Sequence, residues 1–186
     1  MRRLTIRDLS LGGIKLVERK RIGDRRGFLA RMFCADELAE AGWTDPIAQV
    51  NHTYTARRGT VRGMHFQRPP HAEMKLVTCL RGEVWDVALD VRTGSPTYLQ
   101  WCAETLSADN GRALLIPQGF AHGFQTVTDD AELLYCHSKA YNAEAEAGAN
   151  PRDERLAIAW PLPISEISDR DARHPLVEAG LEGVDI

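Results

Sequence analysis

The sequence predicts an all-β fold, a barrel or sandwich of many short strands. Short apolar segments recur along the chain, and Gly, Pro, Asn and Asp separate them at near-regular intervals. Residues 83–91, "EVWDVALDV", add a clear alternation of side chains between two faces. One face holds Val84, Asp86, Ala88 and Asp90, and the other holds Trp85, Val87, Leu89 and Val91.

The expected strands follow one another along the chain, with one short helix between them. Residues 13–22 form a first strand, 24–27 a turn and 28–33 a second strand. A helix covers 34–43, because Asp36 or Ala35 stands near its start and Gly42 near its end. The later strands cover residues 47–55, 60–66 or 61–67, 74–82, 83–91, 97–106, 113–127 and 131–141. The tail from Asn142 is expected to be loop and short helix, since residues 159–171 are rich in proline.

Size and composition indicate a single domain over residues 1–186. Hydrophobic residues make up 44% of the chain and charged residues 26%, as in ordinary soluble domains. No apolar run approaches the length needed to span a membrane, and Arg7 and Asp8 interrupt any signal-peptide core, so we expect a cytoplasmic protein. The four cysteines are far apart and show no CxxC spacing, which disfavours a structural zinc site or a disulfide framework.

The net charge of -3 conceals an asymmetry between the two parts of the chain. Residues 1–75 hold 15 basic and 8 acidic side chains, whereas the remainder holds 8 basic and 18 acidic ones. The arginines are dispersed and form no aromatic-rich basic run, so nucleic-acid binding is disfavoured. A small phosphorylated ligand fits the same basic residues.

The mouth of an antiparallel barrel can hold one small ligand, so inward-facing polar residues are the candidates for a site. If residues 131–141 are extended, one face carries Leu133, Tyr135, His137, Lys139 and Tyr141. This face is either a polar barrel lining or an exposed sheet surface.

The stretch from Arg62 to Val77, "RGMHFQRPPHAEMKLV", carries basic residues and histidines on and after an expected strand. Strict alternation would place Arg62 and His65 on opposite faces of that strand. Both reach one pocket only if the strand bends, and Gly63 between them indicates a bulge.

The segment "IPQGFAHGF" contains Pro117, Gly119 and His122 in a PxGxxH pattern, which resembles the second half of the cupin barrel motif. In the first half, His65 is present but Gln67 replaces a second histidine. His65, Glu73 and His122 would be the ligands of a metal. The spacing of Glu73 and the presence of Lys75 beside the ion disfavour this interpretation.

The remaining polar residues have no chemical role on pattern alone. Asp171 and Glu146 are expected to be solvent-facing acids. The same expectation applies to His52, His71 and His174.

Seven ordered motifs between about residues 5 and 176 together resemble the dTDP-4-dehydrorhamnose 3,5-epimerase family. They read "GDRRGF", "QVNHTYT", "VRGMHFQRPP", "KLVTCLRGEVWDVALDVRTGSPTY", "LLIPQGFAHGF", "LLYCHSKAY" and "AIAWPLP…SDRD". The resemblance implies a metal-free cupin jelly roll with short peripheral helices, a homodimer with exchanged N-terminal strands, and no cofactor. It also implies a nucleotide-linked 4-keto-6-deoxy sugar as substrate, with neither nucleic acid nor a membrane as a partner.

The resemblance also implies roles for named residues. His65 would be the base, and an unperturbed imidazole pKa near 6.5 suits proton abstraction at neutral pH. Asp171 would orient the imidazole, Lys75 would stabilise the enolate at the keto oxygen, and Tyr135 would return a proton from the opposite face.

The implied binding residues fall into three groups. Arg26 and Arg62 would contact the diphosphate, with Arg26 reaching across the dimer. The residues expected around the nucleotide are Phe28, Gln49 and Asn51. The residues expected at the sugar or phosphate end are His122, Tyr141, Glu146 and Arg170.

Three departures from the family pattern affect the substrate. Arg31 replaces a glutamate, Glu73 replaces a glutamine before "xKLV", and the hydroxyls after "QVNH" belong to Thr53 and Thr55 rather than to serines. A 3-only or 5-only epimerase acting on another sugar nucleotide is therefore a second hypothesis. A non-catalytic sugar-nucleotide binding protein and a metal-dependent cupin enzyme are the others.

Overall fold

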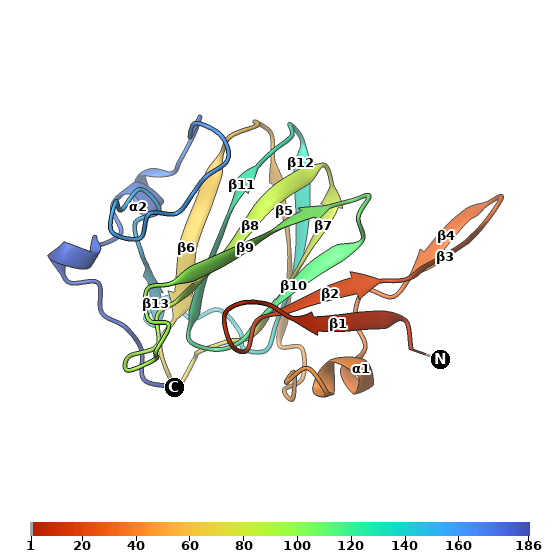
Figure 1. Cartoon of the computed structure of the whole chain (residues 1–186), viewed down its shortest axis with the longest axis horizontal. Coiled ribbons are helices and arrows are strands. Elements are labelled where there is room, and N and C mark those ends of the chain that lie inside the picture. The colour runs from red at the N-terminus through yellow and green to blue at the C-terminus, as the bar shows by residue number, and fades with distance from the viewer. Residues whose placement is uncertain (1) are drawn as a thin grey trace.

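Two antiparallel sheets enclose the interior of the molecule in the computed structural model, which describes residues 2–186 (Figure 1). The six-stranded sheet has the order β1 (Leu4–Asp8), β2 (Lys15–Arg19), β10 (Arg112–Ile116), β7 (Lys75–Arg81), β12 (Ala131–His137) and β5 (Gln49–Thr55). The five-stranded sheet has the order β13 (Glu146–Gly148), β6 (Val61–Gln67), β11 (Phe120–Thr126), β8 (Glu83–Asp90) and β9 (Trp101–Ser107). The predicted all-β class is confirmed.

A separate hairpin of β3 (Arg21–Asp24) and β4 (Gly27–Ala30) projects away from both sheets (Figure 1). Its apolar side chains are largely exposed: Phe28 and Leu29 are 61% and 65% exposed, although the Arg21 guanidinium lies over the Phe28 ring at 4.4 Å. A two-stranded hairpin with exposed apolar residues is marginal by itself.

The helices in the described part of the chain are short: α1 (Ala35–Ala39), α2 (Asp169–Ala172) and a 3-10 turn at Val177–Ala179. No helix within residues 2–186 is long and apolar enough to cross a membrane.

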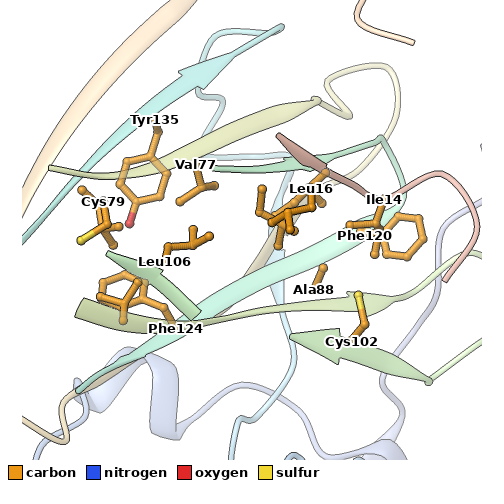
Figure 2. Close-up of a cluster of buried hydrophobic side chains, with 14 of the residues drawn as sticks. Ile14, Leu16, Val77, Cys79, Ala88, Cys102, Leu106, Phe120, Phe124 and Tyr135 are labelled. Atoms are coloured by element: carbon orange, nitrogen blue, oxygen red, sulfur yellow. The ribbon is translucent and has the colours of Figure 1, made fainter. Parts of the chain in front are cut away.

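The core consists of an interior layer between the sheets and two outer layers. The interior cluster includes Leu16, Val77, Leu114, Phe120 and Phe124, and Figure 2 shows most of its side chains. These strands place alternate residues inward, which is why the two sheets share one apolar layer.

The outer layers bury the opposite faces of the same strands. Leu38 and Trp43, from the α1 region, pack with residues of β2, β7 and β10 on the six-stranded sheet. The C-terminal segment packs Leu156, Leu181 and Val184 with residues of β6, β8 and β11 on the five-stranded sheet.

Strand β8 confirms the alternation predicted for residues 83–91. Val84 and Ala88 belong to the interior cluster, whereas Val87 and Leu89 belong to the outer cluster on the five-stranded sheet.

Several predicted boundaries were wrong. Residues 13–22 divide into β2 and β3, and 113–127 divide into β10 and β11 around a turn in which Gly119 has φ +83°. A side chain at Gly119 would lie 2.3 Å from Arg92 Cγ, so the turn requires glycine. Strand β12 ends at His137, so Lys139 and Tyr141 lie outside it. The strand predicted at 28–33 is instead the four-residue strand β4. Strands β1 and β13 were not predicted.

Candidate active site

A cavity of about 770 Å³ opens between the two sheets. It is bounded by β5, β6, β7, β11 and β12 and by the segment that precedes and includes α2. The predicted site residues on its wall are His65, Lys75, Tyr135, Asp171, Gln49, Asn51, Arg62, His122, Tyr141, Glu146 and Arg170. The barrel-lining interpretation therefore holds for Tyr135 and His137, which both line it.

A bulge in β6 brings Arg62 and His65 to the same cavity. His65 pairs with His122 and Arg62 pairs with Phe124, so β6 contains one more residue than β11 over this interval. Gly63 has φ +120°, and a Cβ there would lie 2.5 Å from Gly123 Cα. The bend that the glycine predicted is confirmed.

His65 and Asp171 form a hydrogen-bonded pair on the cavity wall. The Nε2 atom of His65 lies 2.8 Å from Oδ1 of Asp171, while the Gly63 N–H donates to Oδ2 at 3.1 Å. The Ser168 side chain caps α2 by accepting from the backbone N–H of Asp171 at 3.0 Å, which fixes the position of the carboxylate.

Asp171 is 3% exposed, so the expectation of a solvent-facing acid was wrong. Burial alone would raise its pKa, but the hydrogen bond and positive charge of His65, with the Gly63 N–H, outweigh burial and lower the pKa to about 2. The carboxylate is therefore ionised at neutral pH, as a partner for an imidazolium must be.

Arg170 lies between the His65–Asp171 pair and Glu146. Its guanidinium lies 3.3 Å from His65 Nε2 and 3.0 Å from Glu146 Oε1. The Tyr141 hydroxyl donates to Glu146 at 2.7 Å, and the Tyr141 ring is exposed. Glu146 is half-buried rather than fully solvent-facing.

Lys75 and Glu73 are buried in the same wall. The Lys75 ammonium donates to the backbone carbonyl of His65 at 3.0 Å and lies 3.0 Å from Glu73 Oε1. Gln67 donates to the other carboxylate oxygen at 2.9 Å.

Tyr135 faces the cavity from β12, on the sheet opposite the strand that carries His65. It also belongs to the interior cluster, where Figure 2 shows its ring near Val77 and Cys79. A phenol is protonated at neutral pH, and burial raises the pKa of Tyr135 well above its usual value, which keeps the hydroxyl protonated.

Two histidines flank Tyr135. The ring of His137 stacks on Tyr135 with centroids 6.0 Å apart, and burial together with the charge of Lys75 lowers the His137 pKa to about 4. His122 meets the Tyr135 ring edge-on at 5.8 Å and binds the fully buried Asp86 at 2.9 Å.

Further residues that line the cavity lie on β5 and at the start of β6. Gln49 donates to Asn51 at 3.0 Å, and Arg62 donates to the Thr55 hydroxyl at 2.9 Å. Thr53 and Thr55, where the family has serines, both line the cavity.

Arg26 and Phe28 do not line the cavity of their own chain. They belong to the projecting hairpin, where Arg26 pairs with Asp24 at 2.6 Å. Arg31 also lies outside the cavity and pairs with Glu37 of α1.

The residues suggested as metal ligands are engaged otherwise. One oxygen of Glu73 forms an ion pair with Lys75, and the other accepts a hydrogen bond from Gln67. The Nε2 atom of His122 binds Asp86. His65, Asp171 and His174 do place ligand atoms within 4.8 Å of one another. The Arg170 guanidinium already lies beside two of them, however, and its positive charge opposes a cation there. These residues fit a metal poorly.

Two contributors to the site were not predicted as such. Asp86 supports His122, and its signal was a carboxylate between Val84 and Ala88 on one face of the expected strand. Ser168 caps α2 beneath Asp171, and its signal was the Ser-x-x-Asp spacing in residues 168–171.

Known proteins are similar to this chain over most of its length. The family model for dTDP-4-dehydrorhamnose 3,5-epimerase matches residues 8–179. The dTDP-4-dehydrorhamnose 3,5-epimerase of Sinorhizobium fredii is 40% identical over 172 residues, covering 90% of this chain and 86% of the relative. The dTDP-4-dehydrorhamnose 3-epimerase of Streptomyces niveus is 38% identical over 169 residues, covering 90% and 81%.

A solved structure agrees in fold. The dTDP-6-deoxy-D-glucose-3,5-epimerase of Legionella pneumophila, in complex with dTDP-4-keto-L-rhamnose, is similar with a TM-score of 0.89 and 38% identity. The similarity covers 94% of this chain and 93% of that one. The all-β architecture of this chain is thus the jelly roll that the sequence motifs implied.

Proposed function

The chain belongs to the dTDP-4-dehydrorhamnose 3,5-epimerase family and is an isomerase, and from this premise we propose its substrate and mechanism. The proposed reaction inverts carbons 3 and 5 of a nucleotide-linked 4-keto-6-deoxyhexose. The proposed substrate is dTDP-4-dehydro-6-deoxy-glucose, and the product is dTDP-4-dehydro-L-rhamnose.

The chemistry depends on the ketone at carbon 4, which acidifies the C–H bonds of both neighbouring carbons. His65 removes a proton, and the ionised Asp171 stabilises the imidazolium that forms. Lys75 donates a hydrogen bond to the oxygen that becomes negative in the enolate. Tyr135 delivers a proton to the other face of the same carbon.

The position of the acid and the base on opposite sheets is the observation that carries this proposal. His65 lies on β6 of the five-stranded sheet, and Tyr135 lies on β12 of the six-stranded sheet, with one cavity between them. A proton removed toward one sheet and returned from the other inverts the carbon. A binding protein without turnover has no need of this arrangement.

The remaining cavity residues are assigned to the binding of the substrate. Arg62 suits the diphosphate because a guanidinium donates two parallel hydrogen bonds to phosphate oxygens. Gln49 and Asn51 are assigned to the nucleotide. His122, Tyr141, Glu146 and Arg170 are assigned to the sugar or phosphate end.

The dimer is also a proposal. The exposed hairpin Arg21–Ala30 would pair with a second copy, so that Arg26 and Phe28 complete the partner's cavity rather than their own. Strand β5 supports this arrangement because it is an exposed edge of the six-stranded sheet and borders the cavity.

A mono-epimerase is the second candidate, because the Streptomyces niveus relative is a 3-epimerase. The same base and acid serve either carbon, so the choice depends on how the sugar is held between steps.

Proton NMR of dTDP-4-keto-6-deoxyglucose in deuterated water with the purified protein tests the proposal. Incorporation of deuterium at carbons 3 and 5 is expected, and His65→Ala should abolish it. Deuterium at one carbon would establish the mono-epimerase, and no exchange would contradict both reactions for this substrate.

A further inference from the structure

Glu73 forms a buried ion pair with Lys75 inside the cavity wall. The side chains are 5% and 8% exposed, and Oε1 lies 3.0 Å from the ammonium nitrogen. Removing two charges from water is unfavourable unless their remaining hydrogen-bonding groups are satisfied. Such a pair in a ligand cavity suggests a role beyond stability.

The contacts of Lys75 hold its ammonium in the cavity wall and leave it with donors to spare. An ammonium group has three N–H donors. The backbone carbonyl of His65 accepts one of them at 3.0 Å, and Oε1 of Glu73 lies 3.0 Å from the nitrogen as its ion-pair partner. A ligand in the cavity that Lys75 lines can accept from the ammonium as well.

Gln67 presents its amide NH2 group to the carboxylate at position 73. The Asn142 N–H donates to Oε1 of Gln67 at 2.6 Å, which fixes the orientation of the amide. The Nε2 group of Gln67 then donates to Oε2 of Glu73 at 2.9 Å, to the His71 carbonyl at 3.0 Å and to the Ala140 carbonyl at 3.3 Å.

A carboxylate is the side chain that satisfies both neighbours. One oxygen of Glu73 is the ion-pair partner of Lys75, and the other accepts a hydrogen bond from Gln67. A glutamine at this position would have one acceptor oxygen, and its NH2 group would face a donor. The glutamate that replaces the family's glutamine is thus matched to its surroundings in this chain.

We propose that Glu73 is a positioning residue for the epimerisation, which acts by holding the Lys75 ammonium so that its free N–H donors are directed toward the enolate oxygen of the substrate. This inference rests on the proposed function, because it assumes that Lys75 binds the keto oxygen. In this scheme Glu73 acts through Lys75 and not on the reacting atoms.

Steady-state kinetics of Glu73→Gln separate a positioning role from a structural one. We expect kcat to fall about 10- to 100-fold with KM changed less than about twofold, because orientation matters most when charge develops in the transition state. The matched control is Glu104→Gln, which removes a glutamate that pairs with Arg112 at 3.5 Å outside the cavity. A wild-type kcat per folded Glu73→Gln site, or equal effects in both variants, would overturn the proposal.

A second measurement does not depend on turnover. Proton–nitrogen NMR of lysine ammonium groups should show a slowly exchanging Lys75 signal in the wild type, assigned by its loss in Lys75→Arg. The signal should broaden or vanish in Glu73→Gln, and in Glu73→Asp if the first variant does not fold. A signal that is absent from the wild type or unchanged in the variant would overturn the pairing. If the wild type shows no turnover but the signal behaves as expected, the proposed function fails and the positioning of Lys75 stands.

Discussion

His65 and Asp171 lie 106 residues apart in the sequence, yet their side chains meet at 2.8 Å on the cavity wall. The strand β6 supplies the histidine, and the N-terminal turn of α2 supplies the carboxylate. The Gly63 N–H and the Ser168 cap hold Asp171 independently of His65. We therefore expect the aspartate to set the orientation of the imidazole.

Replacing Asp171 by asparagine should slow deuterium exchange into the substrate by about 100- to 1,000-fold. The amide keeps the shape of the carboxylate but lacks the charge that stabilises an imidazolium. NMR in deuterated water measures the rate, and Asp169→Asn, at an exposed position of the same helix, is the control. A rate within threefold of the wild type would remove Asp171 from the mechanism.

The same substitution should change the pH dependence of stability. The pKa of Asp171 is lowered to about 2 in the folded protein, so the ionised group stabilises the fold at pH values above its unfolded pKa near 4. This contribution, about 2 kcal/mol by linkage, is lost as the pH falls through about 2. Urea unfolding of wild type and Asp171→Asn should therefore give a difference in unfolding free energy that is larger at pH 7 than at pH 3. A difference that is constant over this range would refute the assignment.

Replacing Tyr135 by phenylalanine should impair product formation more than proton abstraction. The phenol is protonated at neutral pH and burial raises its pKa further, so its proposed task is to donate a proton after His65 has removed one. We expect epimerised product to form about 100-fold more slowly, while exchange of substrate hydrogens with solvent continues from the His65 side. Product formation at the wild-type rate would show that another group is the acid.

The sequence was sufficient for the fold class and for the bend between Arg62 and His65. Both depend on local patterns, namely the alternation in residues 83–91 and the glycine within a strand. It was insufficient for the burial of Asp171, because that burial depends on a helix cap and on contacts with a strand more than a hundred residues away. Strand β13 was missed because its three residues carry no pattern of their own and are held by pairing with β6.

The resemblance to the family assigned site roles to Asp171 and Glu146, which the sequence pattern alone predicted to be solvent-facing. It could not indicate that Glu73 is paired with both Lys75 and Gln67, because the family pattern has another side chain there. It also assigned Arg26 to the cavity of a second subunit, and Arg26 does not line the cavity of its own chain.

Mixing two inactive variants tests whether Arg26 serves the partner's site. One variant carries Arg26→Gln and the other His65→Ala, and the two are unfolded together, refolded and assayed. If the hairpins exchange, each mixed dimer contains one cavity with an intact His65 that receives an intact Arg26 from the other subunit. Random pairing makes half of the dimers mixed, so about a quarter of the wild-type activity should return. If Arg26 instead folds back onto its own cavity, no mixed dimer has a complete site. The mixture then gives only the activities of the two variants, and the exchanged dimer is wrong.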